Sequence, residues 1–133
     1  EDNLYTRKPF EDGLRDFCLK EDVSVIAYYS LAAGFLTGKY RSKQDVNRSA
    51  RGAAVTEKYL NARGLRILAA LDLVAAAHGT TLAEVALAWL ISRRGVTAPI
   101  ASATTVEQID SLARAASHTL SVEEQSMLTA AAE

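Results

Sequence analysis

The apolar positions near the start of the chain follow a helical period. They stand at i, i+4, i+7 and i+8 and belong to Phe10, Leu14, Phe17 and Cys18. Residues with this spacing lie on one face of a helix. Pro9 precedes them, and proline is well suited to the first turn of a helix. The pattern therefore predicts an amphipathic helix that packs on one side only.

Two short apolar runs favour strands. Residues 23–29 are rich in β-branched and aromatic side chains, without a regular alternation of polar positions. A run of this kind is typical of a strand that is covered on both faces, as in a parallel sheet. Residues 96–101 form the second strand candidate.

A longer helical pattern lies between these two runs, over residues 57–78. Its apolar stripe is formed by Ile67, Leu71 and Val74. Gly64 is a point at which this helix could be interrupted. Gly79 directly follows the pattern and fits a left-handed cap at the end of the helix.

Three capping signals mark the starts of further helices. Each pairs Ser or Thr with Glu or Gln three positions later: Thr81–Glu84, Thr105–Gln108 and Ser121–Glu124. One face of the first helix is formed by Leu82, Val85, Ala86 and Trp89, and Gly95 closes it. In the second helix, Val106 and Ile109 are expected to point inward. The predicted order is helix, strand, two helices, strand, two helices.

Residues 41–54 are polar, charged and interrupted by glycine, with no stable period. Segments of this composition are typical of exposed loops. We expect a flexible excursion here, within a chain that otherwise forms one domain over residues 1–133.

The two predicted strands are too few to form a stable sheet. They are separated by roughly 65 residues of loop and helix, and two apolar parallel strands need further strands beside them. Because unpaired strand edges attract other strands, we expect the isolated chain to associate. It would pair strands between copies or hold an N-terminal fragment.

Composition and charge exclude several classes of function. The formal net charge of −1 over 133 residues leaves no clustered excess of Lys and Arg, so no nucleic-acid partner is expected. No leader pattern and no apolar run of membrane-spanning length is present, so we expect no membrane association and a cytoplasmic protein. The single Cys18 favours a buried thiol over a reactive one. His78 and His118 are not at metal-ligand spacing, and no metal site is expected.

The segment from Val25 to Tyr40 carries the clearest candidate chemistry. An apolar run breaks into a loop of small residues that contains Gly34 and Gly38 and ends on Lys39. Small side chains let backbone N–H groups approach a phosphate closely, and a lysine adds positive charge. The alternative interpretation is an ordinary tight turn with a solvated lysine.

This segment resembles the cofactor loop of the aldo-keto reductases. In that family the seventh strand ends in Tyr-Ser-Pro-Leu, followed by small residues and often Leu-(Thr/Ser)-Gly-Lys-Tyr. The positions in register here are Tyr28, Leu31, Gly34, Leu36, Thr37, Gly38, Lys39 and Tyr40. Tyr29 and Ser30 stand where the family usually has Ser and Pro. Residues 2–7 are similar to the Tyr-Asn-Leu-x-x-Arg segment after the family's sixth strand.

A second block, residues 99–108, resembles the family's Gly-Ala-Ser-x-x-x-Gln segment, which lines the adenosine end of the dinucleotide. Ser102 stands at the usual Gly, and Ser111 and Leu112 occupy the places of the family's common Glu-Asn pair. Free N–H groups at a helix start favour an anion such as the adenosine 2′-phosphate. Gln108 could bind the same phosphate, although it equally makes a structural capping box. The preference for NADP over NAD follows from the family alone.

The resemblance covers nearly the whole chain and implies an α/β fold. The chain would be the C-terminal portion of a (β/α)8 TIM barrel, incomplete in this chain. It implies an NADP-dependent oxidoreductase that reduces a small aldehyde or ketone, or oxidises the matching alcohol. The cofactor-binding residues would be Tyr28, Tyr29, Leu31, Ala32, Gly34, Leu36, Gly38, Lys39, Arg51, Ser102, Thr104, Gln108 and Ser111.

Several alternatives stay open at this point. Tyr28 either stacks on the nicotinamide or belongs to the core, and Arg51 either clamps the cofactor or is simply solvated. The family's catalytic Tyr, Lys, Asp and His come from the first half of the barrel, so the resemblance places them upstream of residue 1. It predicts that the 133-residue chain is a truncated and inactive fragment. The other function considered is a non-catalytic module, derived from the same family, that binds a nucleotide or a protein.

Overall fold

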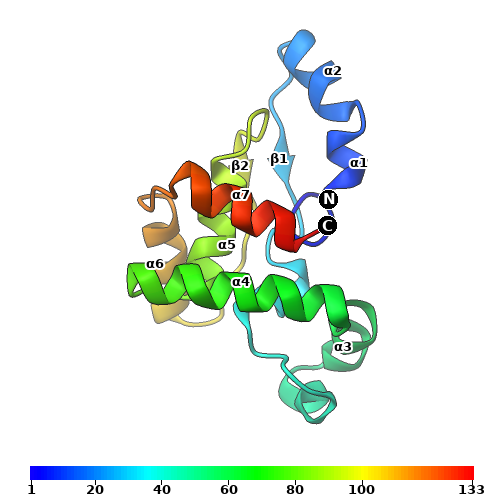
Figure 1. The fold of residues 1–133 in the computed structure, drawn as a ribbon, viewed down its shortest axis with the longest axis vertical. Coiled ribbons are helices and arrows are strands. Elements are labelled where there is room, and N and C mark those ends of the chain that lie inside the picture. Colours follow the sequence, from blue (N-terminus) through cyan, green and yellow to red (C-terminus); the bar gives the residue numbers. More distant parts are fainter.

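The computed structural model describes residues 1–133 and is mostly helical. Its elements, in chain order, are α1 (Lys8–Glu11), α2 (Leu14–Lys20), β1 (Ile26–Ala27), the 3₁₀ helices η1 (Ala32–Thr37) and η2 (Lys43–Arg48), α3 (Gly52–Tyr59), α4 (Ala62–His78), α5 (Leu82–Ile91), β2 (Ala98–Pro99), α6 (Val106–Ala115) and α7 (Val122–Ala131). Helices α1 and α2 stand away from the others, at the end opposite to η2 (Figure 1).

Strands β1 and β2 form a two-stranded parallel sheet. Ile26 lies opposite Ala98, and Ala27 lies opposite Pro99. The predicted parallel pairing is thus confirmed, but each strand has only two residues and is shorter than the apolar run that predicted it. Coverage of both faces is wrong for this chain, because Ile26 is 60% exposed and only Ala27 is buried. A strand is covered on both faces only where neighbouring layers and strands are present.

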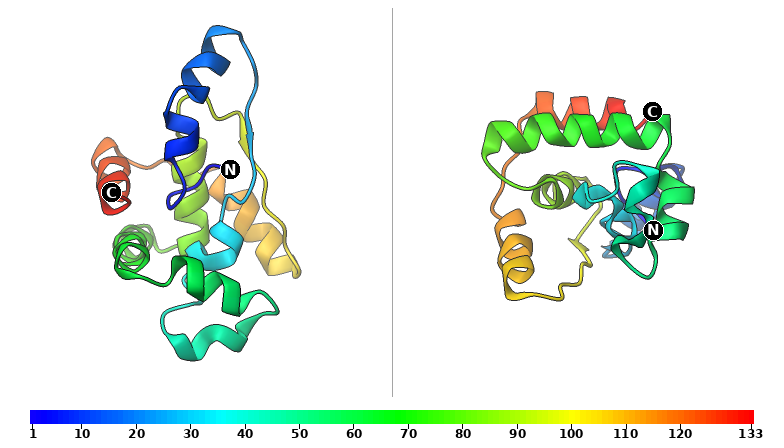
Figure 2. Two further views of the ribbon diagram at one scale, coloured as in Figure 1. Left: turned by 90° about the vertical axis from the view of Figure 1, so that its right-hand side faces the viewer. Right: turned by 90° about the horizontal axis from the view of Figure 1, so that it is seen from below.

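Helix α5 lies at the centre of the core. All seven residues from Glu84 to Leu90 are buried, so this helix is enclosed all round and not only along the predicted face. Helices α4 and α7 lie side by side on one side of α5, and α6 lies on the other (Figure 2). The predicted stripe on α4 is confirmed, since Ile67, Leu71 and Val74 are all buried in this core.

The first helical pattern is divided into two short helices. Helix α1 ends at Glu11, and Gly13 adopts a left-handed φ of 98° before α2 begins. This turn redirects the chain, so Phe10 and Cys18 are buried while Leu14 and Phe17 are exposed. The expected single helix with all four residues on one packed face is therefore wrong. The buried thiol of Cys18 is confirmed.

The second helical pattern is divided as well. Helix α3 begins at Gly52 and ends at Tyr59, and α4 begins at Ala62. The side chain of Asn61 caps α4 by accepting a hydrogen bond from the Gly64 N–H at 3.0 Å. Gly64 thus lies in the first turn of α4 and does not interrupt it. The left-handed cap at Gly79 is confirmed by its φ of 61°.

Residues 41–54 contain regular structure that the sequence did not predict. Ser42 and Asp45 form a capping box at the start of η2, and the last residues of this segment belong to α3. Arg41 holds Asp72 of α4 through two hydrogen bonds of 2.7 Å. Local capping and this ion pair order a segment that lacks an apolar period.

The predicted caps at Thr81, Thr105 and Ser121 are confirmed, because each side chain accepts a hydrogen bond from the N–H three residues later. Of these three, the complete capping box forms only at Ser121, where the Glu124 side chain also accepts from the Ser121 N–H. The expected burial of Val106 and Ile109 on α6 is wrong, since they are 68% and 58% exposed. Helix α6 turns its other face toward α5.

No single helix is long and apolar enough to cross a membrane. Helices α4 and α5 pass the length and composition criteria only as a pair, and they meet at a bend of 96°.

Candidate functional site

The two predicted turns begin at the same edge of the sheet. The N–H of Ile100, just after β2, donates to the carbonyl oxygen of Ala27 at 2.8 Å and to Ser30 Oγ at 3.2 Å. The Ser30 hydroxyl in turn donates to the Ala27 carbonyl at 3.0 Å and is fully buried. Parallel strands place their carboxyl ends together, and Ser30 fastens the two exits to each other. The sequence indicated no role for this serine, which stands where the resemblance expects proline.

The turn after β1 has an unusual backbone. Tyr29, Ala32 and Ala33 have positive φ angles of 57°, 50° and 54°, and Gly34 continues the left-handed run with 89°. Left-handed conformations are costly for residues with a Cβ atom and concentrate at functional sites. The turn is anchored to the core, because Phe35 and Leu36 of η1 are fully buried.

Burial divides the predicted residues of this turn into two groups. The side chains of Ala32 and Leu36 are fully buried, so only their backbone atoms could face a ligand. Leu31 is partly buried and packs against the core. Gly38 ends η1 with a left-handed φ of 78°.

Lys39 extends back over the turn. Its Nζ lies 5.2 Å from the centroid of the Tyr40 ring. A Cβ atom at Gly34 would lie 3.2 Å from the same Nζ, so the lysine lies directly over the glycine. Lys39 forms no ion pair with any residue of the chain. A positive charge without an acidic partner therefore lies against the left-handed backbone, where it could meet an anion.

Tyr28 and Tyr29 form a surface aromatic pair. Their ring centroids are 5.4 Å apart with an interplanar angle of 67°. The two side chains are 51% and 49% exposed, so in this chain Tyr28 does not belong to the core. An exposed ring at the end of a strand has a face free for stacking.

The start of α6 is organised by Gln108. The Oε1 atom of Gln108 accepts hydrogen bonds from the Thr104 N–H at 2.8 Å and from the Thr104 hydroxyl at 3.2 Å. Thr105 caps the helix by accepting from the Gln108 N–H at 3.3 Å. Ser102 and Thr104 are exposed, and the side-chain amide N–H groups of Gln108 form no hydrogen bond within the chain. Hydroxyl and amide donors thus gather at a helix start.

Ser111 lies one turn further along α6 and points toward α5. Its hydroxyl donates to Glu84 Oε1 at 2.7 Å. Glu84 is only 1% exposed and also receives hydrogen bonds from Thr80, Arg114 and His118. Burial alone would raise the pKa of the Glu84 carboxyl, but these hydrogen bonds outweigh it and lower the pKa to about 2. The capping signal at Thr81 gave no indication of this cluster.

Arg51 is not brought to either turn by any contact. It directly precedes α3, and its backbone N–H donates to Ser49 Oγ at 3.2 Å. Its side chain is exposed and forms no hydrogen bond or ion pair. The structure gives the clamp no support.

Each histidine has a carboxylate partner. His78 Nε2 lies 2.8 Å from Glu124 Oε1, and His118 Nε2 lies 2.9 Å from Glu84 Oε2. These pairs join α4 to α7 and the segment after α6 to α5, in agreement with the structural interpretation of both histidines.

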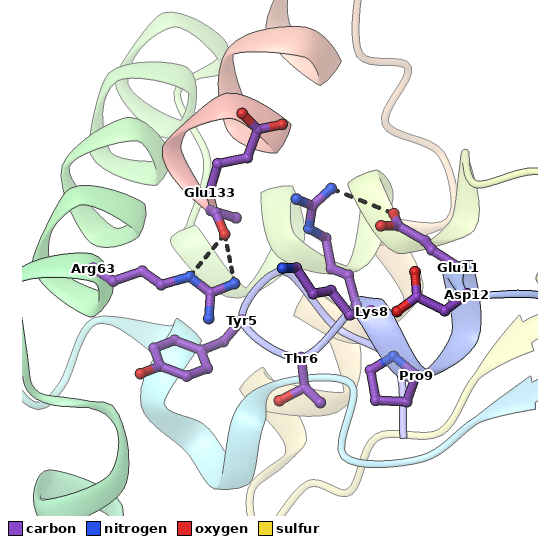
Figure 3. Close-up of a pocket in the computed structure, with 10 residues that line it drawn as sticks. Tyr5, Thr6, Lys8, Pro9, Glu11, Asp12, Arg63 and Glu133 are labelled. Carbon is purple, nitrogen blue, oxygen red and sulfur yellow. Dashed lines mark hydrogen bonds and ion pairs between the residues drawn. The ribbon is translucent and has the colours of Figure 1, made fainter.

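One cavity lies away from both turns. It has a volume of about 690 Å³ and is enclosed by the segment around α1, by Arg63 of α4 and by the end of the chain at Glu133 (Figure 3). Arg63 Nε donates to the carbonyl oxygen of Ala132 at 2.7 Å. None of the predicted cofactor residues lines this cavity, whose walls carry charges of both signs.

Comparison with known proteins agrees with the arrangement of strands and turns. The family model described as the aldo/keto reductase family matches residues 2–133. The chain belongs to the aldo/keto reductase family. This membership implies a TIM-barrel-type α/β fold, and the mostly helical structure with two short strands is consistent with a fragment of such a barrel.

Two curated relatives are similar over most of the chain. The L-glyceraldehyde 3-phosphate reductase of Escherichia coli is 34% identical over 128 residues, which cover 92% of this chain and 37% of that protein. An uncharacterized oxidoreductase of Mycobacterium tuberculosis is 39% identical over 128 residues, covering 91% of this chain and 38% of its own length. This chain therefore spans less than half of these relatives.

One solved structure shows the same fold. It is a thermostable aldo-keto reductase in complex with the inhibitor epalrestat, with a TM-score of 0.68 and 27% sequence identity. The match covers 98% of this chain and 38% of that chain.

Proposed function

We propose that this chain is the cofactor-binding, C-terminal part of an NADP-dependent aldo-keto reductase. The complete polypeptide would reduce aldehydes or ketones to alcohols, or oxidise the matching alcohols. Family membership supports the oxidoreductase class. The observation that carries the proposal is the hydrogen bond from the Ile100 N–H to the buried Ser30 hydroxyl, because it joins the two predicted cofactor turns at one edge of the sheet.

The residues of both turns fit a dinucleotide. At one turn, the unpaired ammonium of Lys39 lies over left-handed backbone around Gly34, a combination that suits a pyrophosphate. At the other, the exposed hydroxyl of Ser102 and the free amide of Gln108 offer donors to a phosphate at the start of α6. Tyr28 would hold the nicotinamide by stacking. When bound, the cofactor supplies the hydride that reduces the carbonyl carbon.

The acid that protonates the carbonyl oxygen lies outside this chain in the proposal. The tyrosines here follow no early barrel strand with a lysine partner, so we assign no catalytic residue among residues 1–133. The isolated chain would accordingly show no turnover of an aldehyde with NADPH, whereas the complete polypeptide would.

Substitution of Lys39 tests the proposal. In the complete polypeptide, Lys39→Met should weaken NADPH binding about tenfold, because a charged hydrogen bond to the cofactor is lost. The dissociation constant is measured by fluorescence titration. Lys43→Met, at an exposed lysine on η2, is the matched control and should leave the constant unchanged. Equal dissociation constants for the wild type and Lys39→Met would refute this assignment.

A further inference from the structure

We infer that Glu84 is a positioning residue for the adenosine end of the cofactor. It holds α6 against α5, so that the start of α6 keeps its place relative to the turn after β1. This inference rests on the proposed function.

One buried carboxylate joins three parts of the structure. Glu84 Oε1 receives the Ser111 hydroxyl at 2.7 Å and Arg114 at 2.9 Å, both from α6. Oε2 lies 2.9 Å from His118 Nε2, in the segment between α6 and α7, and also receives the Thr80 hydroxyl from the corner between α4 and α5. Removal of the negative charge would weaken all of these contacts together.

These polar contacts restrain a helix that buries little apolar surface. Ala115 is the only buried residue of this helix, and its apolar residues Val106 and Ile109 are exposed. A helix without a buried apolar stripe depends on other interactions for its orientation. Ser111 and Arg114 supply them, and both converge on Glu84.

The same turn of α5 also supports the other cofactor turn. A Cβ atom at Gly38 would lie 2.7 Å from Cδ2 of Leu82, which shows how closely η1 approaches the start of α5. Leu82 and Glu84 are two residues apart on an enclosed helix. Helix α5 is therefore a common support that fixes the spacing between η1 and α6.

The carboxylate of Glu84 keeps its negative charge over the neutral pH range in which most enzymes work. Its hydrogen bonds lower the pKa of the carboxyl to about 2, so it stays ionised at neutral pH. It also forms an ion pair with the guanidinium of Arg114, the only Lys or Arg of α6. Helix α6 thus has no free Lys or Arg side chain to offer to a phosphate.

Two molecules that each represent one part of NADP test the positioning role of Glu84 in the complete polypeptide. Adenosine 2′,5′-bisphosphate probes the turn before α6, and reduced nicotinamide mononucleotide probes the turn at Tyr28. Glu84→Gln should weaken binding of the first probe about tenfold and change binding of the second less than about twofold, as expected when a supporting contact is lost. Calorimetric titration gives both dissociation constants.

A matched control removes the other Glu–His pair. Glu124→Gln likewise alters a glutamate that contacts a histidine, but on α7, and should leave both dissociation constants unchanged. If Glu84→Gln does not fold, Arg114→Gln replaces it, because the Arg114 side chain is 58% exposed. The expected loss for the adenosine probe is then about threefold.

The outcomes separate this inference from the proposed function. Equal weakening of both probes, or no change in either, would overturn the positioning role of Glu84 while leaving cofactor binding intact. Failure of the wild type to bind NADPH and both probes would refute the proposed function, and this inference with it.

Discussion

At the scale of single residues, close packing explains why a glycine lies inside the first turn of α4. A Cβ atom at Gly64 would lie 1.9 Å from the carbonyl oxygen of Tyr59 and 2.9 Å from Cζ of Phe35. Glycine therefore lets α4 approach both the end of α3 and the buried ring that supports η1. The pattern of the sequence suggested an interruption at this position, because glycine weakens a helix, but it contained no information on the approaching backbone.

We predict that Gly64→Ala destabilises the protein by about 3 kcal/mol, since the added methyl group overlaps backbone that cannot move aside. Thermal or urea unfolding measures the change. The control is Gly79→Ala, where nothing lies within 4 Å and only the left-handed φ of 61° is unfavourable. That variant should lose about 1 kcal/mol. Similar losses for the two variants would show that packing at Gly64 is looser than described.

At the scale of elements, the sequence predicted helix starts better than helix breaks. Capping side chains act on N–H groups three residues away, so the starts of α5, α6 and α7 could be read locally. The break at Gly13 depends on a left-handed turn. The cap of α4 at Asn61 is local, but Gly64 stands three residues later, where the other predicted caps have Glu or Gln. The exposed face of α6 could not be foreseen either, because an apolar face does not reveal whether another element covers it.

Glu84 gives the junction of α5 and α6 a defined pH dependence. Its carboxyl pKa is lowered from 4.5 to about 2 in the folded state, so the unfolded chain binds more protons between these values. The contribution of Glu84 to stability is therefore complete above pH 4.5 and is lost as the pH falls toward 2.

We predict that Glu84→Gln flattens the pH dependence of the free energy of unfolding between pH 2 and 4.5. Denaturant unfolding at several pH values across this window measures the effect. Glu123→Gln, at an exposed position on α7, is the control and should retain the dependence of the wild type. An unchanged slope in Glu84→Gln would mean that the buried carboxylate has no special link to folding.

At the scale of the whole molecule, large apolar residues remain exposed on α2, in and beside the short sheet, and on α6. They are Leu14, Phe17, Ile26, Ile100, Val106 and Ile109. Relatives extend well beyond the length of this chain, which covers 37% of the Escherichia coli protein. In the proposed complete barrel, upstream strands and helices would cover these residues.

The isolated chain is therefore expected to self-associate at micromolar concentration, because exposed apolar strand edges pair with other strands. Sedimentation velocity measures the distribution of species. Ile26→Lys should shift this distribution toward the monomer, whereas Val122→Lys, on an exposed part of α7, should not. A monomeric wild-type chain would contradict the expectation.

The candidate site was predictable in outline but not in its supports. Parallel strands bring their carboxyl ends together, so the placement of both turns at one edge followed from the two apolar runs. The bridging hydroxyl of Ser30 and the cluster around Glu84 join residues that are far apart in the sequence, and no local pattern marks them. The proposed clamp at Arg51 stays a prediction, because its exposed side chain forms no contact within the chain that would fix its direction.

The most direct test of the account is a crystal structure of the complete polypeptide with NADP bound. We predict that the pyrophosphate lies against residues 32–39 within reach of Lys39, and that the 2′-phosphate lies at the start of α6 beside Thr104 and Gln108. A dinucleotide bound elsewhere, for example in the cavity beside Arg63, would contradict the claim that the two turns hold opposite ends of one cofactor.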